Sequence, residues 1–83
     1  MEAKIIVRSV KGKDGRKFNT FKLVDNDNHG KLVDCVICKT VSEEAINKLV
    51  KSGKAIVKGN ISISNNFEYP KAFIRSLDEV IEA

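Results

Sequence analysis

The sequence is short of the residues that mark several large classes of protein. Its 83 residues include no tryptophan, one proline, one histidine and two cysteines. No apolar run approaches the roughly 20 residues of a membrane span, and the N-terminus lacks the apolar segment of a signal peptide. We therefore expect an intracellular, cytoplasmic protein that forms one domain over residues 1–83, without contact to a membrane.

Groups that carry out chemistry are also scarce. Cys35 and Cys38 form a C-x-x-C pair, but residues three apart on a strand point to opposite faces and neither chelate together nor bridge easily. A second pair of metal ligands is missing, and His29 is the only histidine. We find no nucleophile beside a base, no paired carboxylates and no phosphate-cradling glycine loop. The protein is therefore expected to be no enzyme and to hold no cofactor or metal.

The turn over residues 25–30 contains the pattern Asp25-x-Asp27-x-His29-Gly30, which imitates the start of a calcium loop. Position twelve of that pattern is Val36 rather than glutamate, and no flanking helices are predicted. We interpret this segment as a solvated turn.

The residues that are present favour strands. Short β-branched and apolar stretches, separated by turn residues such as Asp14-Gly15 and Asn65-Asn66, predict strands over residues 3–10, 18–24, 32–38, 55–64 and 69–77. Gly59 is the expected bulge or bend within the fourth strand. The only proline lies near the start of the fifth, where a missing N–H is tolerated.

One helix is predicted between the third and fourth strands. Thr40 with Glu43 fits a capping box, Ser42 is an alternative N-cap, and Gly53 is suited to the left-handed position after the last turn. Apolar residues recur at helical spacing: Val41, Ala45, Ile46, Leu49 and Val50. Five strands with a single helix between the third and fourth indicate an all-β OB fold, a small Greek-key barrel that binds oligonucleotides or oligosaccharides across one face.

Positive charge is concentrated near the N-terminus. Residues 1–24 contain seven Lys and Arg against two Asp and Glu, whereas residues 25–83 contain eight against nine. A one-sided basic field suits a polyanion, because neutralised phosphates release counterions and so supply sequence-independent affinity. A lysine-rich hairpin can also be a solvated edge protected against aggregation. On a five-stranded barrel we favour nucleic acid.

Three segments share a pattern with one known family. They are Asp14-Gly15-Arg16-Lys17-Phe18-Asn19-Thr20-Phe21-Lys22-Leu23, the run from Leu49-Val50-Lys51-Ser52-Gly53 through Ile56-Val57-Lys58-Gly59-Asn60-Ile61, and Tyr69 through Arg75-Ser76-Leu77. In order and spacing they resemble the bacterial and phage single-stranded DNA-binding proteins, over residues 3 to about 81. The resemblance implies largely sequence-independent binding of single-stranded DNA, in replication, recombination or the maintenance of a mobile element.

The chain also departs from this family. The family stacks bases on aromatic side chains, several of them on its third strand, where this sequence has none; Lys39 or Cys38, and Leu32 or Val33, stand in their places. The hairpin between the fourth and fifth strands shrinks to about residues 65–68, and the acidic C-terminal peptide is absent. These differences suggest a minimal phage or mobile-element relative with weaker binding and a different oligomeric state.

The expected binding residues are basic or aromatic. Phe18 shares a face with Thr20 and Lys22, whereas Phe21 alternates with Leu23 and is interpreted as core. Phe67 and Tyr69 are the best stacking candidates, and Phe73 is either a stacking ring or a core plug. The complete candidate set is Arg8, Lys11, Lys13, Arg16, Lys17, Phe18, Lys22, Lys39, Lys58, Phe67, Tyr69, Lys71, Phe73 and Arg75.

Three alternatives remain open: an RNA-binding domain, a protein-interaction module and a structural subunit of a larger assembly. The second draws support from Val33, Cys35 and Ile37, which would form an apolar strip if they faced the groove. We also expect a homodimer through the edges of the first strand, where Ile6 or Val10 would be exposed.

Overall fold

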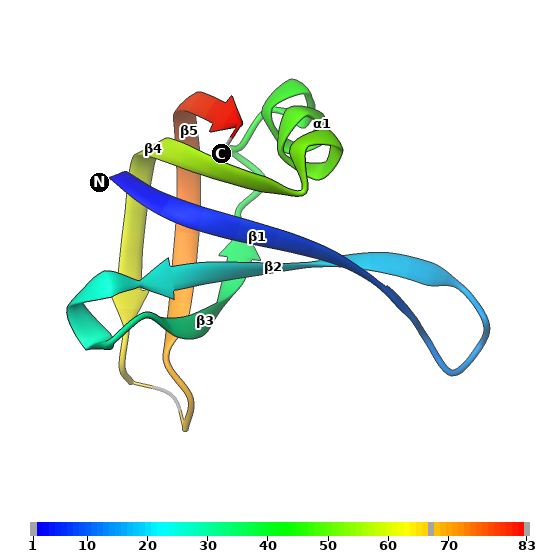
Figure 1. The fold of residues 1–83 in the computed structure, drawn as a ribbon, viewed down its shortest axis with the longest axis horizontal. Coiled ribbons are helices and arrows are strands. Elements are labelled where there is room, and N and C mark those ends of the chain that lie inside the picture. Colours follow the sequence, from blue (N-terminus) through cyan, green and yellow to red (C-terminus); the bar gives the residue numbers. More distant parts are fainter. Residues whose placement is uncertain (1, 67, 83) are drawn as a thin grey trace.

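The computed structural model describes residues 2–66 and 68–82. The elements are β1 (Glu2–Lys11), β2 (Lys17–Asp25), the 3-10 turn η1 (Asn26–Asn28), β3 (Lys31–Ile37), α1 (Glu43–Ser52), β4 (Lys54–Ser64) and β5 (Lys71–Glu82). The strands form a closed barrel in the order β1-β2-β3-β5-β4 (Figure 1). This arrangement confirms the predicted OB-type barrel with one helix between the third and fourth strands.

Alternation along the strands builds the core. In β1 the side chains of Ala3, Ile5 and Val7 point inward, and Leu23 of β2 lies directly opposite Val33 of β3 in the strand pairing. β3 runs parallel to β5, and all the other strand pairs are antiparallel. The buried side chains are Ala3, Ile5, Leu23, Val33, Val41, Leu49, Ala55, Val57, Ile61, Ala72, Ile74 and Val80. Six further strand residues are partly buried and pack against this cluster: Val7, Phe21, Cys35, Ile37, Ile63 and Leu77.

The helix α1 packs beside β4 and β5 at one end of the barrel (Figure 1). Ser42 is its N-cap and accepts a hydrogen bond from the amide of Ala45 at 3.2 Å. Of the two predicted caps the alternative is therefore the one observed, and the capping box of Thr40 and Glu43 is wrong, because Thr40 donates its hydroxyl to the carbonyl of Arg75. Gly53 closes the helix with φ at 71°, and its amide donates to the carbonyl of Leu49, as predicted.

Gly59 lies where β4 bends. The register between β4 and β5 shifts between Lys58 and Gly59 and again before Ile61. A Cβ at position 59 would lie 2.0 Å from the carbonyl oxygen of Ser76. The sharp approach of the two strands therefore requires a residue without a side chain, which confirms the predicted bulge or bend.

The fifth strand differs from its prediction at both ends. β5 begins at Lys71 rather than at residue 69 and continues to Glu82 rather than to residue 77. Tyr69 and Pro70 remain in the connection, because Pro70 has no amide to donate to a strand pairing. The extension arises because the last residues of β5 pair with β4 from Ala55 to Lys58. β3 also ends one residue early, at Ile37.

The β1–β2 hairpin reaches beyond the barrel (Figure 1). β1 pairs with β2 as far as Lys11, but with β4 only from Glu2 to Ile6, and β2 pairs with β3 only from Lys22. Residues 8–20 therefore form a two-stranded ribbon, which is closed by a turn with Gly15 at φ 83°. We call this segment the ribbon.

The barrel limits the dimer that we expected through the first strand. β2 and β4 occupy both edges of β1 from Lys4 to Ile6, and Ile6 and Val10 are half-buried rather than exposed. Only the ribbon part of β1 leaves an edge along which a second copy could pair. The dimer itself stays a prediction.

Candidate nucleic-acid interface

The outward side of three neighbouring strands forms a mixed basic and apolar surface. Because Leu23, Val33, Ala72 and Ile74 point into the core, the residues beside them in sequence point outward. We call this surface the β2–β3–β5 face, and it consists of Lys22, Val24, Leu32, Asp34, Val36, Lys71, Phe73 and Arg75. Residues far apart in the sequence are brought together on it by strand register.

A row of three charges crosses the middle of this face. Lys22 of β2 lies opposite Asp34 of β3, and Asp34 lies opposite Lys71 of β5. The Lys22 ammonium donates to the Asp34 carboxylate; the two side chains are 34% and 55% exposed. An ion pair this exposed contributes about 0–1 kcal/mol to folding, so both groups remain available for a ligand. Sequence reasoning selected both lysines but missed Asp34, which becomes visible only with the strand register.

Phe73 lies beside this row and faces outward. It pairs with Val36 of β3 on one side and with Ser62 of β4 on the other. The guanidinium carbon of Arg75 lies 5.9 Å from the centroid of the Phe73 ring, and Arg75 also donates to the Ser62 hydroxyl at 2.6 Å. Phe73 is half-buried and outside the core cluster. Phe73 is therefore an outward ring beside a cation and not a core plug.

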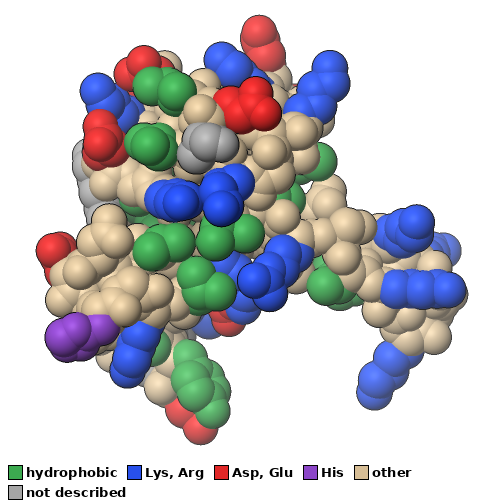
Figure 2. Space-filling view, in the orientation of Figure 1, with side chains coloured by type: hydrophobic (Ala, Val, Ile, Leu, Met, Phe, Trp, Pro, Cys, Tyr) green, Lys and Arg blue, Asp and Glu red, His purple; other side chains and the backbone are tan. Residues whose placement is uncertain are grey.

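The ribbon carries most of the remaining candidates. Lys11, Lys13, Arg16 and Lys17 are all exposed, as is Arg8 at the point where the ribbon leaves the barrel. Figure 2 shows Lys and Arg side chains gathered over this projection, away from the acidic side chains visible on the barrel.

One carboxylate lies within this basic ribbon. Asp14 accepts the Arg16 amide at 3.0 Å and lies 3.6 Å from its side chain, so it orders the turn. Phe18 lies at the base of the turn, opposite Val10, and is 52% exposed. A ring beside exposed cations is the combination that single-stranded nucleic acid uses for stacking and phosphate contact.

A concavity lies at the end of the face next to η1, between β2, β3 and the connection from β4 to β5. It has a volume of about 320 Å³ and is lined by Lys22, Asn28, Lys31, Leu32, Val33, Asp34, Tyr69 and Pro70. Tyr69 is 70% exposed and Leu32 46% exposed, so two apolar surfaces border the Lys22–Asp34 pair. Tyr69 comes from the connection between β4 and β5. Its neighbour Phe67, the other stacking candidate, lies outside the described residues.

Two of the predicted lysines, Lys39 and Lys58, are not part of the β2–β3–β5 face. Lys58 points outward from β4 toward Glu2 and Glu79, at 3.6 and 3.8 Å, so it belongs to an ion-pair group on another side of the barrel. Lys39 is exposed in the segment after β3, which the Thr40 hydroxyl ties to the β5 backbone. Lys39 therefore lies close to the Arg75 end of the face, whereas Lys58 does not.

The apolar strip that favoured protein binding is not on the surface. Val33 is buried, and Cys35 and Ile37 pack against the core rather than facing the groove. Burial, helped by the negative charge of Asp34, raises the pKa of the Cys35 thiol to about 12. This thiol is therefore neutral at ordinary pH. Because the three side chains do not form an exposed strip, they no longer support the protein-interaction alternative.

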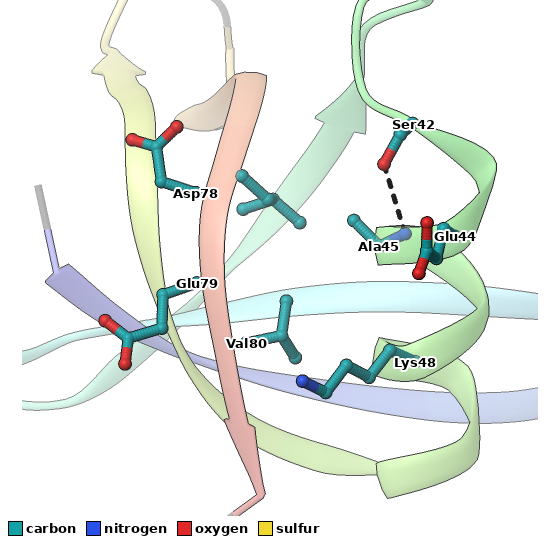
Figure 3. A pocket seen from close by; sticks show the side chains of 8 residues that line it. Ser42, Glu44, Ala45, Lys48, Asp78, Glu79 and Val80 are labelled. Atoms are coloured by element: carbon teal, nitrogen blue, oxygen red, sulfur yellow. Dashed lines mark hydrogen bonds between the residues drawn. The ribbon is translucent and has the colours of Figure 1, made fainter.

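A second concavity, of about 250 Å³, lies between α1 and the last part of β5. Glu44, Asp78 and Glu79 border it, which disfavours a polyanion there. Figure 3 shows Asp78 and Glu79 pointing away from the helix, so the three carboxylates do not converge. Among the described residues, no group of three or more His, Cys, Asp or Glu is placed to hold a metal ion. In the η1 turn, Asp25 accepts the Asp27 amide at 3.2 Å.

Within the described part of the chain, no helix is long and apolar enough to cross a membrane. Comparison of the chain with family models, with curated proteins and with solved structures found no match.

Proposed function

We propose that this protein binds single-stranded DNA along a path from the ribbon, across the β2–β3–β5 face, to Tyr69. The observation that carries the proposal is the succession of outward-facing cations and rings along this path, from the exposed cations of the ribbon to the half-buried Lys22 and Lys71 of the face. The path also coincides with the region that OB barrels use for oligonucleotides, namely strands two and three with the loops between strands one and two and between strands four and five.

Two kinds of contact share the binding. The ribbon cations and the lysines of the face neutralise phosphates, whose counterions are released, so that affinity falls steeply with salt. Phe18, Phe73 and Tyr69 offer rings on which unpaired bases stack, a contact open to every base. Because exposed rings are few, the phosphate contacts carry the larger share of the affinity. A duplex, whose bases are stacked inside, cannot use the rings and should bind more weakly.

Fluorescence anisotropy with labelled oligo-dT, oligo-U and a duplex of equal length, each at two salt concentrations, tests the proposal. We expect oligo-dT to bind most tightly and every affinity to fall as salt rises. Equal or tighter binding of oligo-U would assign the face to RNA. An absence of binding to all three at low salt would refute nucleic-acid binding.

A further inference from the structure

The concavity beside Tyr69 contains an acceptor, the Asp34 carboxylate, that a purely phosphate-binding surface does not require. Lys22 and Asp34 lie side by side on neighbouring strands and are joined through one carboxylate oxygen, Oδ1. Lysine offers only donors, and an ionised carboxylate offers only acceptors. A negative charge in the path of a phosphate chain opposes binding, so Asp34 calls for another role.

The pair matches the edge of one base better than the edges of the others. Guanine presents one carbonyl acceptor followed by two neighbouring N–H donors, which complement the Lys22 ammonium and the two oxygens of the Asp34 carboxylate. Cytosine presents one amino donor beside a ring nitrogen and a carbonyl, and adenine presents one amino donor beside a ring nitrogen, so each makes fewer such bonds. Thymine presents a single N–H between two carbonyls, so one of its carbonyls would face the carboxylate.

The surroundings are suited to a single base. The volume of about 320 Å³ is at the lower end of the range for ligand pockets. Tyr69 and Leu32 line it with apolar surface, against which the flat side of a ring can lie. Lys31 lies on the same rim and reaches toward solvent, where the phosphates of an entering strand would run.

From this geometry we propose that the concavity is a nucleobase subsite that selects guanine through Lys22 and Asp34. This inference rests on the proposed function, because it assigns a base preference to one position of the same DNA path. The remaining positions, which consist of cations and rings, read no base edge. The protein would therefore bind all single strands and favour those that offer one guanine to this position.

The test uses oligo-dT with one central residue changed to dG, deoxyinosine, dC or dA; a single guanine keeps guanine-rich folding out of the measurement. We expect the dG oligonucleotide to bind about 5- to 10-fold more tightly than all-dT, the low end of discrimination by a bidentate base contact. Deoxyinosine, which lacks the second donor, should lie between them, and dC and dA should lie close to dT.

Asp34→Asn should abolish the ratio of dG to dT affinity, because the amide replaces one acceptor by a donor. Asp78→Asn is the matched control: it removes the same charge from an exposed residue on another side of the barrel and should preserve the ratio. Equal affinities of wild type for dG and dT oligonucleotides would overturn the subsite and leave DNA binding intact. A ratio that survives in Asp34→Asn would also overturn it. Failure of every oligonucleotide to bind would refute the proposed function itself.

Discussion

Replacing Tyr69 by alanine separates a ring that binds from one that packs. Tyr69 is 70% exposed and lies outside any strand, so the substitution should change the free energy of unfolding by less than about 0.5 kcal/mol. Stacking of one base on an aromatic side chain is worth about 1–3 kcal/mol. Tyr69→Ala should therefore weaken oligo-dT binding by a factor of roughly 5 to 150.

Phe21→Ala is the matched comparison, in which we expect a loss of stability rather than a loss of affinity. Its ring is half-buried against the core and lies opposite Val7 on β1. A phenylalanine deletion in a core costs about 3–5 kcal/mol, and partial exposure places Phe21 near the lower value. At the usual stability per residue, the free energy of unfolding of a chain of 83 residues is roughly 4–12 kcal/mol. The variant should melt at least ~12 °C below wild type, while its folded fraction binds DNA normally.

The assay pairs a thermal melt with an oligo-dT titration on each variant. A fall in the melting temperature of Tyr69→Ala comparable to that of Phe21→Ala, with unchanged affinity of the folded protein, would show that Tyr69 is structural. Stacking would then depend on Phe18 and Phe73. Phe67→Ala belongs in the same series, where the sequence predicts the behaviour of Tyr69.

Three further outcomes follow from the structure. Replacing Arg16 and Lys17 together by alanine should flatten the plot of log K against log salt by up to about 1.4 units, at roughly 0.7 per phosphate contact. Gly59→Ala should destabilise or unfold the protein, seen as a lowered melting temperature, because the new Cβ meets the Ser76 carbonyl at 2.0 Å. Cys35 should react with iodoacetamide at pH 8 much more slowly in the folded than in the urea-unfolded protein, because burial raises its pKa to about 12.

A particular result would refute each of these three predictions. For the salt slope, the control is the double alanine variant of Lys48 and Lys51 on α1, which removes the same charge away from the path; equal slopes in both variants would remove the ribbon from the interface. A wild-type melting temperature for Gly59→Ala would refute the close approach of β4 and β5. Equal alkylation rates in folded and unfolded protein would show that Cys35 is accessible.

The succession of strands along the chain and the position of the helix were predictable because each depends on local pattern. Turn residues bounded the first four strands to within two residues, and Gly53 ended the helix as expected. The start of β5 was missed because Tyr69 belongs to a β-favouring run that Pro70 interrupts, and its end was missed because residues 78–82 gain strand structure only from pairing with β4.

The binding face was less predictable, since β3 is apolar on both sides. Hydrophobicity alone could assign Val33, Cys35 and Ile37 to either face. The charge of Asp34 is the one sign in this strand that the even-numbered residues point outward. The partnership of Asp34 with Lys22 depends on a register between strands. Lys58 was selected for its charge, although its acidic neighbours come from β1 and β5 and are not near it in the sequence.

The most direct test of the central claim is amide chemical-shift mapping of the labelled protein during titration with oligo-dT. We expect the shifts to concentrate in the ribbon, in residues 21–24 of β2, in β3 from Leu32 to Val36, at Tyr69 and in β5 from Lys71 to Arg75. The amides of α1 and of the exposed Ile56–Ile81 pair on β4 and β5 should stay unchanged. Shifts confined to α1 or to the Ile56–Ile81 pair, with the β2–β3–β5 face silent, would contradict the account.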